Sequence, residues 1–160
     1  MAAAAAENGH IAVLRWAREH GCPLDETICA AVAQRGHLDV LRWAREHHCP
    51  WDETTCATAA HDGQLEALKW AREHGCPWTV STICREAAVG GQPEVLKWLR
   101  EQSCPWDETT CAAAAQEGQL EVLKWAREHD CPWSACAAQG GHLEVLQWAR
   151  AHGCPEWPLT

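Results

Sequence analysis

The nine residues CPWDETTCA occur twice in the sequence, at residues 49–57 and again at residues 104–112. Two further sequence features recur regularly along the chain. A Cys-Pro pair recurs six times, at intervals of 27, 27, 28, 27 and 23 residues, and a glycine that precedes an amphipathic segment recurs at the same intervals. A fixed period of this length is typical of a solenoid of stacked units. The repeated string is therefore predicted to be a structural element of each unit.

Each unit is predicted to begin with a short helix. In the clearest copy the helix starts after Asp52, which is a good N-cap, and stops at Gly63. Cys56, Ala59 and Ala60 are spaced i, i+3 and i+4, so they share one face of this helix. All three are small, and we therefore expect the first helices of neighbouring units to approach one another closely.

A second, amphipathic helix is predicted to complete each unit. In residues 38–47 the apolar side chains cover a wide arc, and Asp39, Arg42 and Glu46 form a solvated strip of alternating charge. The proline of Cys-Pro then ends the helix. Period-two alternation is absent along the sequence, so the predicted fold class is all-α with paired antiparallel helices.

Composition limits the kinds of partner. The formal net charge of −9 argues against nucleic acid and anionic membranes, which attract clusters of Lys and Arg. The apolar runs are too short to span a bilayer, and no signal peptide is evident. We therefore expect a protein partner, without nucleic-acid binding or membrane insertion.

Residues 54–78, TTCATAAHDGQLEALKWAREHGCPW, resemble an ankyrin repeat. The familiar form of that repeat runs T-P-L-H-x-A-A-x-x-G-H and continues into an amphipathic helix. Thr54 holds the Thr position, Ala59 and Ala60 hold the paired Ala, and Gly63 holds the Gly. The resemblance extends over nearly the whole chain, and is closest to a short variety, rich in Trp and Cys, of large DNA viruses and unicellular algae.

The resemblance implies a single ankyrin-like helical-repeat solenoid domain over residues 1–160. Ankyrin repeats have about 33 residues, whereas these have 27, and the missing residues fall where the family places its β-hairpin. We therefore expect no β-hairpin fingers. The predicted repeats are 1–21 (partial), 22–48, 49–75, 76–103, 104–130 and 131–153, followed by a tail at 154–160.

A solenoid offers an extended surface that suits proteins or peptides, and the resemblance implies a non-catalytic protein–protein interaction scaffold. Contacts with a partner are expected where the repeats differ at exposed first-helix positions, and at a tryptophan in the tail. The candidate residues are Arg35, Thr58, His61, Asp62, Arg85, Glu86, Gln116, Glu117 and Trp157.

Two alternative functions stay open on the sequence. One is a structural linker or peripheral subunit of a large assembly, and the other is a zinc or thiol-redox module. The cysteine spacing disfavours zinc, because Cys22 and Cys29 are separated by six residues and zinc sites use tighter spacings. We therefore expect no metal or other cofactor, although Cys22 and Cys29, or their equivalents, could meet within a unit. Free thiols indicate an intracellular, reducing compartment.

The tryptophans and the Cys-His pairs are predicted to be structural. Any Cys-His pair would occur four or five times over, whereas an active site needs a unique constellation, so an enzyme is not expected. Tryptophans that recur at one place in every unit should fill the same gap between neighbours. They are Trp16, Trp43, Trp70, Trp98, Trp125 and Trp148 in the second helices, and Trp51, Trp78, Trp106 and Trp133 after Cys-Pro.

Overall fold

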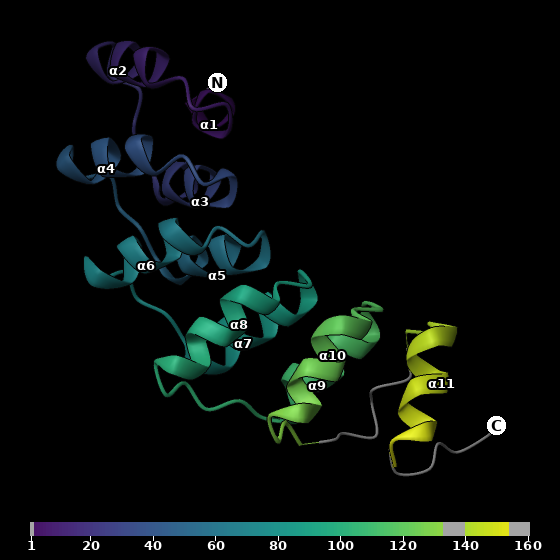
Figure 1. Ribbon diagram of the computed structural model, residues 1–160. Helices are drawn as coiled ribbons and strands as arrows, with labels where there is room; N and C mark the ends of the chain where they lie inside the picture. Colours follow the sequence, from purple (N-terminus) through teal and green to yellow (C-terminus); the bar gives the residue numbers. More distant parts are fainter. Residues whose placement is uncertain (1, 133–139, 154–160) are drawn as a thin grey trace. The chain divides into compact units, whose positions relative to one another are not determined.

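The computed structural model describes residues 2–132 and 140–153, and every regular element within them is an α-helix (Figure 1). The first helices of the pairs are α1 (Ala2–Glu7), α3 (Glu26–Arg35), α5 (Glu53–His61), α7 (Val80–Val89) and α9 (Glu108–Gln116). The second helices are α2 (Ile11–Glu19), α4 (Leu38–Glu46), α6 (Leu65–Glu73), α8 (Pro93–Glu101), α10 (Leu120–Glu128) and α11 (Leu143–Ala151). The predicted all-α class is confirmed.

The chain forms two compact units, Met1–Thr79 and Val80–Thr160. Within each unit a first helix packs on the second helix that follows it, as Figure 1 shows for α3 and α4. The first helices also stack on one another: α3 lies between α1 and α5 in the first unit, and α7 packs on α9 in the second. Each unit is therefore a row of helix pairs, with the closest packing between first helices.

Three first helices begin at an aspartate. The carboxylates of Asp25, Asp52 and Asp107 accept a hydrogen bond from the backbone N–H of the threonine two positions on, at 3.2, 2.9 and 2.9 Å. This bond satisfies one of the N–H groups that a helix start leaves without a partner. The predicted N-cap at Asp52 is confirmed. Because α5 begins directly after it, no β-hairpin fits between Cys-Pro and the first helix.

The glycine at the end of a first helix is covered by the next repeat. Gly36 has φ +71°, a left-handed conformation that glycine adopts without strain. A Cβ there would lie 2.2 Å from Oε1 of Gln64, which precedes the second helix of the following repeat. His37 covers Gly9 in the same way, and its Nε2 lies 3.1 Å from the carbonyl oxygen of Glu7. The side chains of Gln64 and His37 thus each pack on a glycine of the preceding repeat.

The core combines small residues with leucines. In α5 the predicted face of Cys56, Ala59 and Ala60 is fully buried, which confirms the close approach of the first helices. Five second helices (α2, α4, α6, α8 and α10) bury a leucine at one equivalent position. These fully buried leucines are Leu14, Leu41, Leu68, Leu96 and Leu123.

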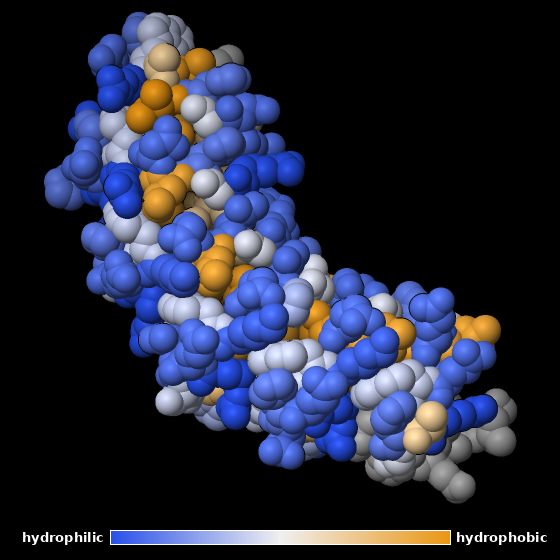
Figure 2. Space-filling view, viewed as in Figure 1, coloured by the Kyte–Doolittle hydropathy of each residue, from blue (hydrophilic) through white to orange (hydrophobic). Residues whose placement is uncertain are grey.

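The surface is mostly hydrophilic. In the face that Figure 2 shows, apolar side chains appear as small patches between polar ones. Among the described residues, the exposed large hydrophobic side chains are Val13, Trp16 and Leu143. In the part of the chain that the structure describes, no helix is both long and apolar enough to cross a bilayer.

Two threonines of the core have a buried hydroxyl group that makes no hydrogen bond to any described residue. Thr55 and Thr110 are almost fully buried, and no described group hydrogen-bonds to either Oγ1 atom. Ile28 and Ile83 hold the same position in α3 and α7 and are equally buried. The position is therefore apolar in character, and the threonine hydroxyl is an energetic cost.

We expect Thr55→Val to raise the free energy of unfolding by about 1 kcal/mol. Valine keeps the shape of threonine and removes a buried hydroxyl, and an unsatisfied buried group costs about 1–3 kcal/mol. Urea unfolding followed by circular dichroism measures the change. The control Thr55→Ser keeps the hydroxyl and removes the methyl group, so it should not stabilise. A loss of stability in Thr55→Val would contradict the prediction.

Candidate functional site

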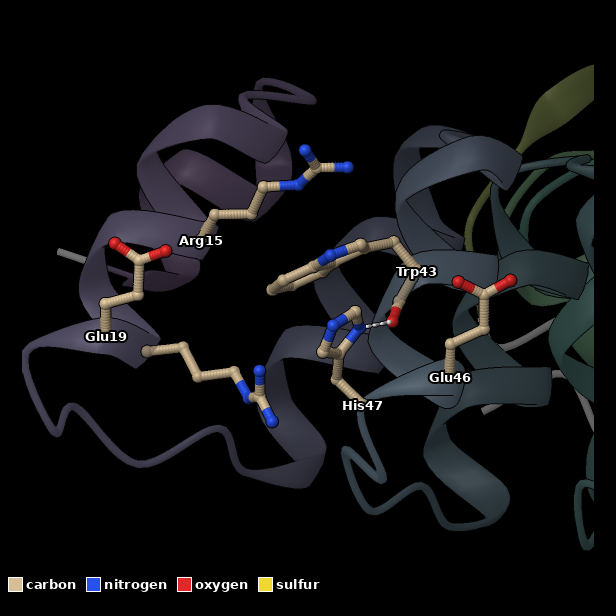
Figure 3. Close-up of a pocket in the computed structure, with 6 residues that line it drawn as sticks. Arg15, Glu19, Trp43, Glu46 and His47 are labelled. Carbon is tan, nitrogen blue, oxygen red and sulfur yellow. Dashed lines mark hydrogen bonds between the residues drawn. The ribbon is translucent and has the colours of Figure 1, made fainter.

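A cleft of about 310 Å³ lies between α2 and α4 in the first unit (Figure 3). Figure 3 shows Arg15 and Glu19 on one side of this cleft and Trp43, Glu46 and His47 on the other. The residues that line the cleft are Arg15, Arg18 and Glu19 from α2, and Trp43, Glu46 and His47 from α4 and its C-cap.

The cleft recurs one repeat further along the chain. A second cleft, of about 720 Å³, lies between α4 and α6. Its lining residues are Arg42, Arg45, Glu46, Trp70, Glu73 and His74, which include the residues 27 positions after those of the first cleft. The second-helix sequence, a basic residue followed by Trp-Ala-Arg-Glu-His, thus produces both clefts.

The histidines of these clefts are held by their own helices. His47 Nδ1 lies 2.8 Å from the Trp43 carbonyl oxygen, and the two rings are 4.5 Å apart. His74 lies on Trp70 in the same way, with 4.1 Å between the ring centroids. Within the described residues, no three His, Cys, Asp or Glu side chains gather closely enough to hold a metal ion.

The two clefts differ in how their arginines are held. Arg45 lies 4.0 Å from the ring centroid of Trp51, and its Nη1 donates to the Cys49 carbonyl. The preceding repeat has Leu24 at the position of Trp51. Arg18, which corresponds to Arg45, has no ring contact, hydrogen bond or ion pair with any described residue.

Arg15, like Arg18, lacks a contact that its counterpart in the next repeat makes. Arg42, one repeat on, lies 5.9 Å from the ring centroid of Trp70. Arg15 is exposed and likewise has no such contact within the described part of the chain. The α2–α4 cleft therefore presents two guanidinium groups that the fold itself does not engage.

The cysteines meet in an arrangement that differs from the pairing considered above. Cys22 is exposed, and the thiol of Cys29 instead hydrogen-bonds to Cys49, 20 residues later. The Cys49 thiol in turn donates to the Asp25 carbonyl at 3.2 Å. The hydrogen bond with Cys49, together with burial, raises the pKa of the Cys29 thiol well above its usual range. The recurring spacing of 20 residues is the signal in the sequence that would have revealed this pairing.

Most of the predicted contact residues reach the surface. Arg35, Gln116 and Glu117 are exposed, as expected. Arg85 is also exposed, and its Nη1 lies 2.8 Å from Oε1 of the half-buried Glu86.

The remaining predicted contact residues are more enclosed. His61 and Asp62 are half-buried and hydrogen-bond to each other at 2.6 Å. Thr58 differs from the expected exposed position, because it is half-buried and its hydroxyl donates to the Thr54 carbonyl at 2.9 Å. Trp157 lies outside the described residues.

Trp43 lies between neighbouring helix pairs, whereas the contacts between two tryptophans lie within one repeat, and Trp133 is outside the described residues. Trp51 meets Trp70 edge-on at 5.9 Å, and Trp106 meets Trp125 at 5.4 Å. Trp16 is the departure: 52 % of it is exposed, whereas its counterpart Trp43 is buried against α2. No described repeat lies before α2 to cover Trp16.

The fold is that of an ankyrin repeat domain. The crystal structure of the human ASB11 ankyrin repeat domain matches 96 % of this chain and 84 % of that chain, with a TM-score of 0.66 and 15 % sequence identity. No protein-family model matches the sequence, and a search of curated proteins finds no match. The predicted ankyrin-like solenoid is confirmed. Its assignment to the short variety rich in Trp and Cys stays a prediction.

Proposed function

We propose that the protein is a non-catalytic scaffold that binds another protein through its repeat surface. The supporting observation is a contrast between two neighbouring positions of the first helices. One position is a buried alanine in four repeats: Ala33, Ala60, Ala88 and Ala115. Two residues further on, the same four repeats have Arg35, Asp62, Gly90 and Glu117, which differ in charge. A constant interior beneath a varied surface is the arrangement that an interaction scaffold requires.

The α2–α4 cleft supplies a second contact point in this proposal. Two unengaged guanidinium groups, from Arg15 and Arg18, suit a carboxylate of the partner, because arginine binds carboxylates with paired hydrogen bonds. Glu19 and Glu46 line the same cleft and disfavour a partner that carries several negative charges there. The cleft therefore fits one acidic side chain of a protein surface rather than a polyanion.

A peripheral subunit of a larger assembly is a specific form of the same proposal. The half-exposed Trp16 and the exposed Val13 form an apolar face on α2, and apolar faces of this kind mark protein contacts. The nine described cysteines are all free thiols, which suits a reducing compartment.

Charge reversal on the first-helix surface is expected to weaken binding to the partner at least tenfold, about 1.4 kcal/mol. The test variant is Glu117→Lys and the matched control is Glu128→Lys. Both residues are exposed at the end of a helix in the second unit, on a first and a second helix respectively. Affinity capture from the source, quantified by mass spectrometry, measures retention of the partner.

The expected result is a partner retained by the wild type and by Glu128→Lys, and lost by Glu117→Lys. Equal retention by all three proteins would exclude this surface of α9 as the contact. A protein that is isolated from its source as a bare chain, without any bound protein, would contradict the scaffold proposal.

A further inference from the structure

Two second helices expose faces that the other second helices keep covered. They are α2, which is the first of them, and α11, which is the last one that the structure describes. We propose that these two faces bind each other between copies of the chain, so that α11 of one copy packs on α2 of another. This proposal goes beyond the scaffold role, because the partner at these two faces is a second copy of the protein itself.

The exposed face of α2 contains Val13 and Trp16. Val13 is 39 % exposed, whereas the residues at its position in the other second helices are at most 2 % exposed. Those residues are Val40, Ala67, Val95, Val122 and Val145. Trp16 is half-exposed, whereas its counterpart Trp43 is buried and points from α4 toward α2 of the preceding repeat (Figure 3). Val13 and Trp16 therefore lie on the face against which a preceding repeat packs.

The exposed face of α11 is the one that α2 covers. In α11 the valine, Val145, is buried, but Leu146 is half-buried and Leu143 is exposed. The counterpart of Leu146 in α2 is Leu14, which is fully buried although no described repeat precedes it. The leucine position is thus covered from the side of the following repeat. No described repeat follows α11, so α11 presents the face against which a following repeat packs.

A glycine and a histidine show the same relation. His142 covers Gly118 of the preceding repeat, where a Cβ would lie 2.8 Å from the imidazole ring. Gly141 is the corresponding glycine before α11, and no described residue comes within 4 Å of the position of its Cβ. His10, which precedes α2, is exposed. An α2 face packed on an α11 face would bring these two residues together, in the combination already present at Gly118 and His142.

The charges of the two faces are complementary. Arg150 of α11 corresponds to Arg18, which lines the α2–α4 cleft together with Glu46. Glu46 also lines the cleft on the other side of α4, so its counterpart Glu19 is placed to line a cleft on either side of α2. Residue 151 of α11 is an alanine where α2 has Glu19, so no second carboxylate opposes Glu19. One arginine would therefore face one glutamate across the contact, and such complementarity favours specific association.

The self-association of the purified full chain tests the proposal, by sedimentation velocity over a range of concentrations. The average mass of the wild type should rise with concentration above the 17.7 kDa of one chain. A contact between two different faces adds copies head to tail. Val13→Glu and Leu143→Glu each charge one face, and each should weaken association at least about tenfold, because an apolar contact does not accommodate an unpaired charge.

Ala12→Glu is the matched control. It adds the same charge to α2 one residue before Val13, at an exposed position. The other second helices carry an acidic residue at this position: Asp39, Glu66, Glu94, Glu121 and Glu144. This control should therefore associate as the wild type does. Trp16→Ala is a second variant of the α2 face that introduces no charge, and it should also weaken association.

An equimolar mixture of Val13→Glu and Leu143→Glu determines whether the contact joins two different faces. The first variant keeps the α11 face and the second keeps the α2 face, so the mixture should form a dimer although neither variant associates alone. Circular dichroism of each variant should show the helical signal of the wild type, because both side chains are exposed.

Three results would overturn the proposal. One is a wild type that keeps the mass of a single chain at every concentration. Another is wild-type association by Val13→Glu, Trp16→Ala or Leu143→Glu alone, which would place the contact elsewhere on the surface. The third is a mixture of the two folded charge variants that stays monomeric.

Discussion

Leu68→Ala is expected to lower the free energy of unfolding by about 3 kcal/mol. The side chain is fully buried in α6, and deletion of a buried leucine side chain costs about 2–5 kcal/mol through lost burial and the cavity that remains. The same position is a fully buried leucine in α10, so Leu123→Ala should cost a similar amount in the second unit. Folded domains are stable by only about 5–15 kcal/mol, so either change removes a large share of the total.

Leu143→Ala is the matched control for this prediction. Leu143 is also a helical leucine, but 66 % of it is exposed, so the same chemical change should alter stability by less than about 0.5 kcal/mol. Urea unfolding of the three variants, followed by circular dichroism, measures the differences. A cost below about 1 kcal/mol for Leu68→Ala would show that the leucine row is not the core of the helix pairs.

Much of the fold can be predicted from the sequence because each repeat contains the same short-range structural signals. Asp52 caps the helix that follows it, Ala59 and Ala60 give that helix a face of small residues, and proline ends the second helix. Each of these residues affects only positions close to it in the sequence. Such signals need no knowledge of the tertiary structure. Repetition then multiplies each weak signal, and the period itself identifies the stacking of units.

The features that the sequence did not reveal depend on contacts between elements. The Cys29–Cys49 pair forms only when two helices close on each other, so it escapes an analysis that compares neighbouring cysteines. The position of Thr58 in its own helix predicts an exposed side chain, but its hydroxyl also lies 3.2 Å from the Ala30 carbonyl of α3. Arg18 has no aromatic ring to contact because Leu24 stands where the next repeat has Trp51. Leu24 lies outside the helix that carries Arg18, so the sequence of that helix does not reveal the difference.

Alkaline pH is expected to destabilise the protein through Cys84. Burial, and next the neighbouring Cys104, raise the pKa of the Cys84 thiol from its ordinary value of 9.0 to about 12. The folded state therefore keeps this proton at pH values where the unfolded chain has lost it. The stabilisation is complete below pH 9 and is lost as the pH rises toward 12. In that window the free energy of unfolding should fall by about 1.4 kcal/mol per pH unit for this thiol.

Urea unfolding of two variants at about pH 8 and about pH 10.5 isolates this effect, which amounts to about 2 kcal/mol between the two conditions. The chain contains no tyrosine, so no phenol titrates in the window. Cys22→Ala removes an exposed thiol and should keep the full pH dependence of the wild type. Cys84→Ala should lose the share that belongs to Cys84, although it begins from a lower stability at pH 8. The same fall in both variants would mean that the folded protein does not hold Cys84 as a buried, neutral thiol.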